Sequence, residues 1–513
     1  MKRKLQDAIG MIGEDLIASA KSGRKKMRRF WKTAALPAVA VLLITALVCG
    51  GVYWRGGFFD PPIATPANPA DPQKDHIDDL PSEIPNGSGG NQKPNQTPTV
   101  DPKAESLVLC SYPTVASFPD LNKISDEEWH DVYQAWRKER ATYKSLAEEC
   151  GGINAFVQKT MVAFLEKGEG NALYSPLNLY LALAMLAEAT EGAARAEILG
   201  LLDAESLSAL RQKAKGLWES HYRADGAVGL VLASSLWLAE ELECDQATLD
   251  RLKDNYYTSV FRGEMGSEGY NQALRDWLNE QTDGLLQDYV SKETMDSGTL
   301  FNLVTSVYYS AKWDQSFWSA GTGVFHGTAG DINCGYMKNS DDSTYYWGEN
   351  FGAVDRSFKA SGGSMRFILP DKDVNVDSLL TDSEVLQFIS GHSGWANSKR
   401  MIIHHTIPKF DVSAQVDLVE GLKGLGVSKV FSSMDSFSPL VGDQEAYLNS
   451  ASHTARVMID EDGCKAAAYT EMAATGDPPP PDEEIDFVLD RPFVFVIYSE
   501  HDVPLFVGVV NQP

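Results

Sequence analysis

The chain has 513 residues, of which 43% are hydrophobic and 10% aromatic, so it holds enough apolar side chains for a sizeable core and is not a wholly disordered protein. Its net charge of −26 and sequence pI near 4.7 exclude nucleic-acid binding, because such a surface repels a phosphate backbone. The six cysteines are scattered and form no C-x-x-C pair, so we expect neither a structural zinc site nor a disulfide scaffold.

The N-terminal region combines a basic tail with an uncharged run. The first 33 residues contain ten Lys and Arg against three acidic residues, and residues 33–54 carry no charge. As a helix, these 22 residues are long enough to cross a bilayer core of about 30 Å. Because positive charge stays on the cytoplasmic side, we predict a cytoplasmic tail over 1–32, a transmembrane helix over 33–54 and an extracellular remainder, which makes a single-pass protein of the cell membrane. A cleaved signal peptide is the competing interpretation, although no A-x-A site closes the apolar run.

Two segments lead from the predicted membrane helix to the folded part. Residues 55–105 include ten prolines between positions 61 and 102, a composition that predicts an extended extracellular linker. Residues 106–150 then show one helical pattern of large apolar side chains, for which Ser125 is a suitable N-cap, and we expect a helical extension here. Cys110 and Cys150 bracket this extension, and outside the cell they could form a disulfide.

From residue 151 to residue 513 the pattern is that of one folded domain. An amphipathic helix is expected over 153–165, and Ser175 followed by Pro176 is a favoured start for the buried helix after it. Strand-like runs lie at 229–238, 303–309, 365–369, 402–410, 455–459 and 493–498. Because helices and strands are mixed without strict alternation, the sequence predicts an α+β fold.

Seven motifs of this domain follow one another in the order found in a known family. They read NALYSPL (171–177), LVTSVYYSAKW (303–313), FILP (367–370), IPKF (407–410), VDLVEGLKGLGVSKVF (416–431), SHTARVMIDEDGCKAAAYT (452–470) and DRPFVFVIYSEHDVPLFVGVV (490–510). With these motifs, region 151–513 resembles the serpins, the serine-protease-inhibitor superfamily, in a bacterial-type form with an N-terminal anchor. The resemblance implies the serpin fold, with large mixed β-sheets, about nine helices and an exposed reactive-centre loop.

The segment after Glu461 has an unusual composition. Gly463 precedes three consecutive alanines, and four prolines follow at 478–481. Three alanines alone would favour a helix, but the glycine and the prolines favour an exposed loop. With the period of a strand, one face is uncharged and has no bulky group except Met472, whereas the other face carries the long polar side chains and Tyr469. The pattern predicts a strand that can insert into an existing sheet. The residues assigned to the hinge and the insertion are Glu461, Gly463, Cys464, Ala466, Ala467, Ala468 and Thr470.

In the serpin resemblance, this insertion is the mechanism of inhibition. A target serine protease attacks the loop and forms an acyl bond, and the freed N-terminal half of the loop then inserts into the sheet and distorts the protease before water releases it. The resemblance implies no catalytic residue, no metal site and no cofactor in this chain, and a target serine protease as its partner. The cleaved bond falls between Asp477 and Pro478, or earlier, after Thr475 or Gly476. Small residues here suit an elastase- or subtilisin-like target, which we favour over a protease that selects aspartate.

The resemblance also assigns a region where the sheet opens, and there the sequence departs from the family pattern. The region comprises Ser175, Asn178, Thr305, Trp313 and His453. Asn178 replaces the second serine of the usual motif, and Thr305 replaces an asparagine. In the loop, Cys464 replaces a threonine and Tyr469 replaces a small residue. These departures keep open a non-inhibitory serpin that acts as a surface binding or carrier module. A membrane-anchored hydrolase has no supporting motif, because G-x-S-x-G, H-E-x-x-H and Walker sequences are absent.

Overall fold

The structure is a computed structural model, and it describes residues 104–120, 124–165, 168–287, 294–391, 394–432, 436–448, 451–464 and 481–513. The predicted tail over 1–32, the transmembrane helix over 33–54, the linker up to residue 103 and the loop over 465–480 lie outside these residues. The loop predictions that fall there concern Ala466, Ala467, Ala468, Thr470, Thr475, Gly476, Asp477 and Pro478. Among the helices that are described, none combines the length and the apolar character that a membrane span needs.

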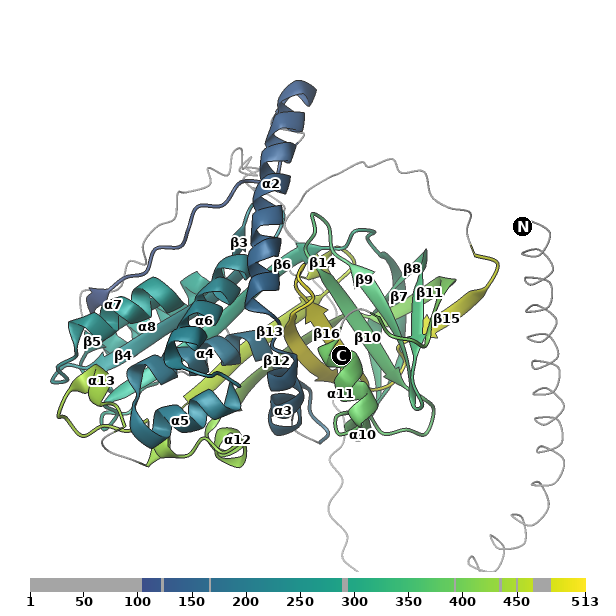
Figure 1. Cartoon of the computed structure of the whole chain (residues 1–513). Coiled ribbons are helices and arrows are strands. Elements are labelled where there is room, and N and C mark those ends of the chain that lie inside the picture. The colour runs from purple at the N-terminus through teal and green to yellow at the C-terminus, as the bar shows by residue number, and fades with distance from the viewer. Residues whose placement is uncertain are drawn as a thin grey trace, which may run out of the picture. The chain divides into compact units, whose positions relative to one another are not determined.

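Two mixed β-sheets and eleven α-helices make up the described residues (Figure 1). The predicted α+β class is confirmed. The family resemblance implied about nine helices. The additional helices include α10 (Val376–Leu379) and α13 (Ser438–Val441). Each has four residues, and a segment of this length is too short for a helical period to show in the sequence.

The eight-stranded sheet contains the strands that form the candidate site. In spatial order its strands are β1 (Glu105–Val108), β5 (Thr258–Gly263), β4 (Gly229–Ala239), β6 (Phe301–Lys312), β14 (Gly463–Cys464), β13 (Ala451–Ile459) and β12 (Phe410–Asp417), and β3 (Arg223–Ala224) pairs with β4 outside this path. The strands predicted at 229–238, 303–309 and 455–459 are confirmed as β4, β6 and β13.

The nine-stranded sheet supplies the rest of the β-structure. Its order is β15 (Glu484–Val488), β11 (Ser398–Pro408), β8 (Gly330–Trp347), β9 (Phe351–Ser357), β10 (Ser364–Pro370), β16 (Phe493–Tyr498), β17 (Pro504–Val510) and β2 (Ala172–Tyr174), with β7 (Trp318–Gly327) paired to β8. Strand β16 is buried at all six positions, as its unbroken apolar sequence predicts. The strand predicted over 402–410 is confirmed as β11 up to Pro408, but its predicted end was wrong. The chain leaves β11 at Pro408, which has no N–H for the ladder, and enters β12 of the other sheet at Phe410.

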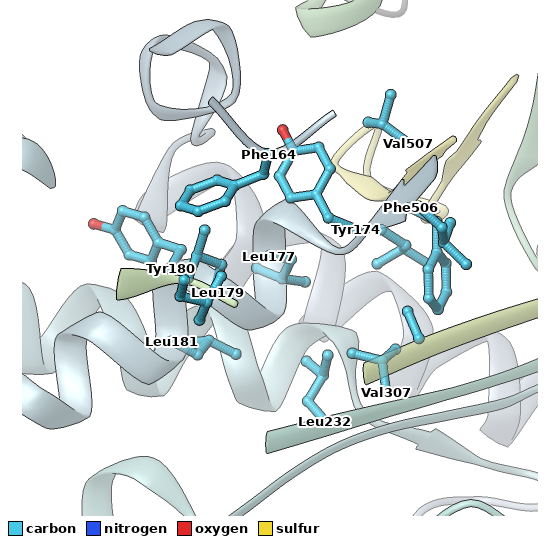
Figure 2. Close-up of a cluster of buried hydrophobic side chains, with 14 of the residues drawn as sticks. Phe164, Tyr174, Leu177, Leu179, Tyr180, Leu181, Leu232, Val307, Phe506 and Val507 are labelled. Atoms are coloured by element: carbon cyan, nitrogen blue, oxygen red, sulfur yellow. The ribbon is translucent and has the colours of Figure 1, made fainter. Parts of the chain in front are cut away.

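Helices cover both faces of the eight-stranded sheet. Helix α4 (Pro176–Ala189) is buried at every position, and Figure 2 shows its Leu177 on the side of Leu232 of β4 and Val307 of β6. We call the sheet face toward α4 the inner face. On the opposite, outer face, the Tyr270 ring of α8 (Glu268–Gln281) lies 5.2 Å from the ring of Trp237, which points away from the Leu232 side of β4 because successive strand residues alternate between faces. The remaining helices are α3 (Asn154–Phe164), α5 (Gly192–Leu201), α6 (Leu207–His221), α7 (Gln246–Tyr256), α11 (Ser383–Ser390), α12 (Val419–Gly424) and the 3-10 helix η1 (Lys429–Phe431).

The segment expected as a helical extension joins the folded domain at two places. Strand β1 pairs antiparallel with β5 and so adds an edge to the eight-stranded sheet. Helix α2 (Asp126–Cys150) begins with the predicted cap, because Ser125 Oγ accepts a hydrogen bond from the Glu128 N–H and Glu128 accepts one from the Ser125 N–H. The helix is fixed by Trp136, whose Nε1 donates to Asp225 Oδ2 at 3.1 Å.

The disulfide considered between Cys110 and Cys150 is not formed, and both residues are free thiols. Cys110 Sγ lies 3.1 Å from the hydroxyl of Ser259 in β5, at the edge of the sheet. Cys150 lies at the far end of α2, beside Gly216 of α6. The 25-residue helix α2, which spans roughly 37 Å at 1.5 Å per residue, ends against α6, whereas Cys110 is held at β5.

Candidate functional site

The candidate site begins where the chain enters the two-residue strand β14. Cys464 lies opposite Ala311 of β6 and opposite Ile459 of β13, so β14 is inserted between these two strands (Figure 1). Further along, β6 and β13 pair directly and in parallel, from Leu303 with Ala451 to Ser306 with Thr454. At one end of the eight-stranded sheet, β6 and β13 are therefore separated by the two residues of β14. Beyond these residues the two strands pair directly with each other. We call residues 460–464 the hinge, and the boundary between β6 and β13 the seam.

Trp313 holds the turn that leads into β14. Its backbone N–H donates to the Asp462 carbonyl at 3.0 Å, and its indole Nε1 donates to the Asp460 carbonyl at 2.9 Å. Asp460 Oδ1 accepts hydrogen bonds from the backbone N–H groups of Asp462 and Gly463, at 2.8 and 3.2 Å. These bonds close a tight turn of the kind that aspartate side chains favour. Trp313 is fully buried, so the turn rests on a fixed support.

Glu461 ties the hinge to the neighbouring strands. Its carbonyl accepts from the Phe317 N–H at 2.9 Å, and its carboxylate lies 3.3 Å from Lys409 Nζ. Partial burial opposes ionisation of this carboxyl group, but a backbone hydrogen bond and Lys409 outweigh it and lower its pKa. The hinge is thus held in place by an ion pair as well as by backbone bonds.

Gly463 is required by the close approach of β14 to β6. Its φ is +154°, and a Cβ at this position would lie 2.3 Å from the Ala311 carbonyl oxygen. The next residue, Cys464, is 2% exposed and points to the inner face. Burial raises the pKa of its thiol to about 12, so the group is neutral and behaves as a small apolar side chain. Cysteine therefore fits the first insertion position.

A cluster of buried polar residues lies on the inner side of the seam. Ser175 and Asn178 come from the start of α4, and Thr305 and His453 are partners across the seam. The Ser175 N–H donates to His453 Nε2 at 3.0 Å. Helix α4 is thereby bonded to β13 at the level where β6 and β13 still pair directly. We call these four residues the seam cluster.

The four residues of the seam cluster are buried, but several of their polar atoms make no hydrogen bond within the described residues. Burial lowers the pKa of His453 to about 4, so its ring is neutral at pH 7, and because Nε2 accepts, Nδ1 carries the proton. Within the described residues, His453 Nδ1 and both polar atoms of the Asn178 carboxamide have no partner, and neither does the hydroxyl of Ser306 on the outer side. An unpaired buried polar group costs about 1–3 kcal/mol. The closed seam therefore contains buried polar groups that make no hydrogen bond within the described residues.

The structure separates the residues assigned to sheet opening into two places. Trp313 lies at the hinge with Glu461, Gly463 and Cys464, whereas the other four residues form the seam cluster. Sequence reasoning missed Asp460, Lys409 and Ser306. Asp460 could have been found, since an aspartate three residues before a glycine is a common turn signal. Lys409 and Ser306 could not, because their roles depend on strand pairings between distant segments.

Comparison with known proteins shows which family the chain is similar to. A model of the family described as "Serpin (serine protease inhibitor)" matches residues 152–513. A serine protease inhibitor from Cyanea capillata is 25% identical over 362 residues, which cover 67% of this chain and 93% of that protein. A neuroserpin from Mus musculus is 26% identical over 371 residues, which cover 67% of this chain and 86% of the relative. The expected bacterial type has no support in these relatives.

Solved structures agree on the fold. The thermophilic serpin tengpin in its native state matches with a TM-score of 0.63 at 21% identity, covering 80% of this chain and 100% of that one. A thyroxine-binding globulin in complex with thyroxine matches with a TM-score of 0.60 at 20% identity, covering 72% and 100%. At such identities the likeness shows the fold alone. The family model spans more than two thirds of the chain, including the hinge and every strand of the two sheets except β1, and the chain therefore belongs to the serpin family.

Proposed function

We propose that this serpin inhibits a serine protease as a suicide substrate. The observation that carries the proposal is β14, in which two hinge residues already lie between β6 and β13. The uncharged face of residues 464–474 continues directly from this strand. An insertion that begins at Cys464 extends the backbone pairing that β14 already makes with β6 and β13. It does not have to form a first pair of hydrogen-bonded residues between these strands.

The chemistry belongs to the protease, and this chain supplies a substrate and a conformational change. The protease serine attacks the carbonyl carbon of the scissile residue, the peptide C–N bond breaks, and the leaving nitrogen takes a proton to become a new N-terminus. The chain upstream of the cut remains esterified to the protease. Its insertion along the seam moves the protease before water can hydrolyse the ester, while the new N-terminus stays with β15.

The proposed cleavage lies after Thr475, Gly476 or Asp477. An elastase- or subtilisin-like protease with a shallow pocket accepts small residues such as the first two. Pro478 disfavours a cut directly before it, which supports a bond slightly upstream. The target is therefore proposed to be a serine protease that selects small residues.

The test mixes the full chain with a panel of elastase-like, subtilisin-like and aspartate-selecting serine proteases. We expect a complex that survives denaturing electrophoresis, and mass spectrometry of the released C-terminal fragment will identify the bond. A matched control is Ala468→Arg, which places a charge on the uncharged face and should give cleavage without a complex, since a buried unpaired charge opposes insertion. Cleavage without any complex for the unmodified chain across the whole panel would refute inhibition.

Display on the outer face of the cell membrane is the second part of the proposal. It is supported by the basic tail over 1–32 and the uncharged run over 33–54. In whole cells, externally added protease should digest the serpin domain while a tag at residue 1 stays protected. Release of the full-length chain by alkaline washing would contradict a membrane-spanning anchor.

A carrier without inhibitory activity is the alternative function, and the thyroxine-binding globulin shares its fold. The sequence arguments for it were Asn178, Cys464 and Tyr469. Cys464 no longer favours it, because this residue is already accommodated in the sheet. A carrier should show no gain in thermal stability when its loop is cut, whereas an inhibitor should melt at a higher temperature after cleavage.

A further inference from the structure

Three buried ionisable side chains from three strands of the nine-stranded sheet meet beside the hinge. Asp341 comes from β8, Arg356 from β9 and His405 from β11. The Nε2 of His405 donates to Asp341 Oδ1 at 2.8 Å, and the Nη1 of Arg356 donates to Asp341 Oδ2. The side chains of His405 and Arg356 are 0% and 3% exposed. We call these three residues the buried triad.

The buried triad supports the segment that holds the hinge. This segment, residues 314–317, connects β6 to β7, and we call it the link. Arg356 Nη2 donates to the Gln315 carbonyl at 2.9 Å, and the guanidinium lies 4.9 Å from the centre of the Phe317 ring. The Phe317 N–H in turn donates to the Glu461 carbonyl at 2.9 Å. Arg356 therefore joins the buried triad to the segment that bonds to the hinge backbone.

The charges of the buried triad balance only while His405 is neutral. Asp341 and Arg356 form an ion pair, and burial lowers the pKa of His405 below its ordinary value of 6.5. The Nδ1 of His405 has no partner within the described residues. A proton added at Nδ1 would bring a second cation close to Arg356, together with a buried donor that lacks an acceptor.

The surroundings of His405 offer little to balance that second cation. Its backbone partners in the neighbouring strands, Asn339 of β8 and Phe487 of β15, are uncharged. The adjacent His404 lies on the opposite face of β11, where its Nε2 is 3.3 Å from the Glu484 carboxylate. Beyond the triad and His404, the charged groups nearby are exposed Asp314 of the link and the ion pair of Glu461 with Lys409. The carboxylate that bonds to His405 is thus already shared with the guanidinium.

We propose that the buried triad is a pH-sensitive latch of the hinge, in which a proton on His405 displaces Arg356 from the link and the link then releases Glu461. Two effects act in this direction. The imidazolium repels the guanidinium, and it competes with the guanidinium for the single carboxylate of Asp341. Opening of the link admits water, which removes the cost of two cations beside one buried anion. The latch acts on the intact chain and is independent of the proposed inhibition.

The test measures hydrogen exchange of the intact, full-length chain by peptide mass spectrometry at pH 7.5 and pH 5, corrected for intrinsic exchange rates. The stabilisation by neutral His405 is complete above pH 6.5 and is lost as the pH falls below that value. We therefore expect the protection of peptides that contain the link and the hinge to fall by on the order of tenfold at pH 5. Peptides of β4 should keep their protection and serve as the internal reference.

Two neighbouring histidines provide a matched pair of variants. In His405→Gln, the side-chain amide can still donate to Asp341 but does not titrate, so the link and the hinge should keep their protection at pH 5. His404 is 39% exposed, and His404→Gln should show the same fall as the unmodified chain. An equal fall in His405→Gln and in the unmodified chain overturns the proposal, as does a fall that His404→Gln abolishes.

Arg356→Lys tests the connection between the buried triad and the link, and it gives an answer even if His405→Gln does not fold. Lysine keeps the charge but lacks the fork that reaches both Asp341 and the Gln315 carbonyl. The link should therefore exchange faster at pH 7.5, and its dependence on pH should shrink. An unchanged fall in this variant overturns the latch. Loss of protection in β13 that equals the loss in the link of the unmodified chain would place the response at His453 and also refute the latch.

Discussion

At the scale of single residues, His453 links the closure of the seam to pH. Its ring accepts the hydrogen bond from the Ser175 N–H only when it is neutral. Burial lowers its pKa to about 4, below the ordinary value of 6.5, so between these values the unfolded chain binds a proton that the folded chain does not. The stabilisation is complete above pH 6.5 and is lost as the pH falls toward 4. Burial lowers the pKa of His221 and His501 in the same direction, so they add to the slope.

We therefore expect the intact chain to lose stability between pH 7.5 and pH 5, with about 2 kcal/mol from His453 alone. In His453→Asn, whose side-chain oxygen can still accept from Ser175, the loss over this range should be smaller by about that amount. Urea unfolding at both pH values measures the difference. An unchanged loss in the variant would show that His453 is not the group that titrates.

Gly463 decides whether the hinge can stay in the sheet. A Cβ there would meet the Ala311 carbonyl oxygen at 2.3 Å, so Gly463→Ala should displace β14 and expose the thiol of Cys464, which is 2% exposed in the docked hinge. We expect alkylation of Cys464 to become at least about tenfold faster, the factor that corresponds to 1.4 kcal/mol of opening free energy. Peptide mass spectrometry reports the labelled residue. The control is Gly424→Ala, because nothing lies within 4 Å of a Cβ added there. Equal labelling rates in both variants would contradict the docked hinge.

At the scale of elements, Trp136 is one of the side chains that attach helix α2 to the domain, beside the ion pair of Arg140 with Glu500. The Trp136 side chain is 3% exposed, donates to Asp225 and meets Phe118 edge-to-face at a centroid distance of 4.9 Å. Trp136→Ala should cost about 3–5 kcal/mol and make α2 and β1 exchange amide hydrogens faster than β4 and β6. Val132→Ala on the same helix should cost less than about 0.5 kcal/mol, since Val132 is 36% exposed. Uniform loss of protection over the whole chain would show instead that α2 unfolds only with the domain.

Helices and strands whose sequence pattern lies within their own residues could be predicted from the sequence. Strands that form only because they pair with segments far away in the sequence could not. The cap at Ser125 and the apolar run of β16 need only neighbouring residues, and both are as predicted. Strand β1 has too few residues for an alternating apolar pattern to show in the sequence. It forms because its backbone pairs with the edge strand β5. In the candidate site, Gly463 was found from the composition around it. The docking of β14 was not, because the gap that receives it lies between β6 and β13, which are far apart in the sequence.

At the scale of the whole molecule, the seam separates two groups of strands that share few bonds. One group runs from β1 to β6, the other contains β13 and β12, and below β14 they are joined by four directly paired positions. A strand inserted there exchanges one parallel ladder for two antiparallel ladders and so adds hydrogen bonds. In the proposed mechanism, this gain in hydrogen bonds is the reason why we expect the cut molecule to be more stable than the intact one.

The folded unit also includes more than the part that matches the family model. The match begins at residue 152, yet Val108 is buried in the core of the domain, the Phe118 N–H donates to the Asp225 carbonyl at 2.8 Å, and β1 covers the edge of β5. A chain that starts at residue 104 keeps all of these contacts and is the reference. A chain that starts at residue 151 exposes that edge and the face of α6 that α2 covers, and it should melt several degrees lower and aggregate. Size-exclusion chromatography and thermal unfolding of the two shortened chains measure this, and equal Tm values would show that residues 104–150 add nothing to the stability of the fold.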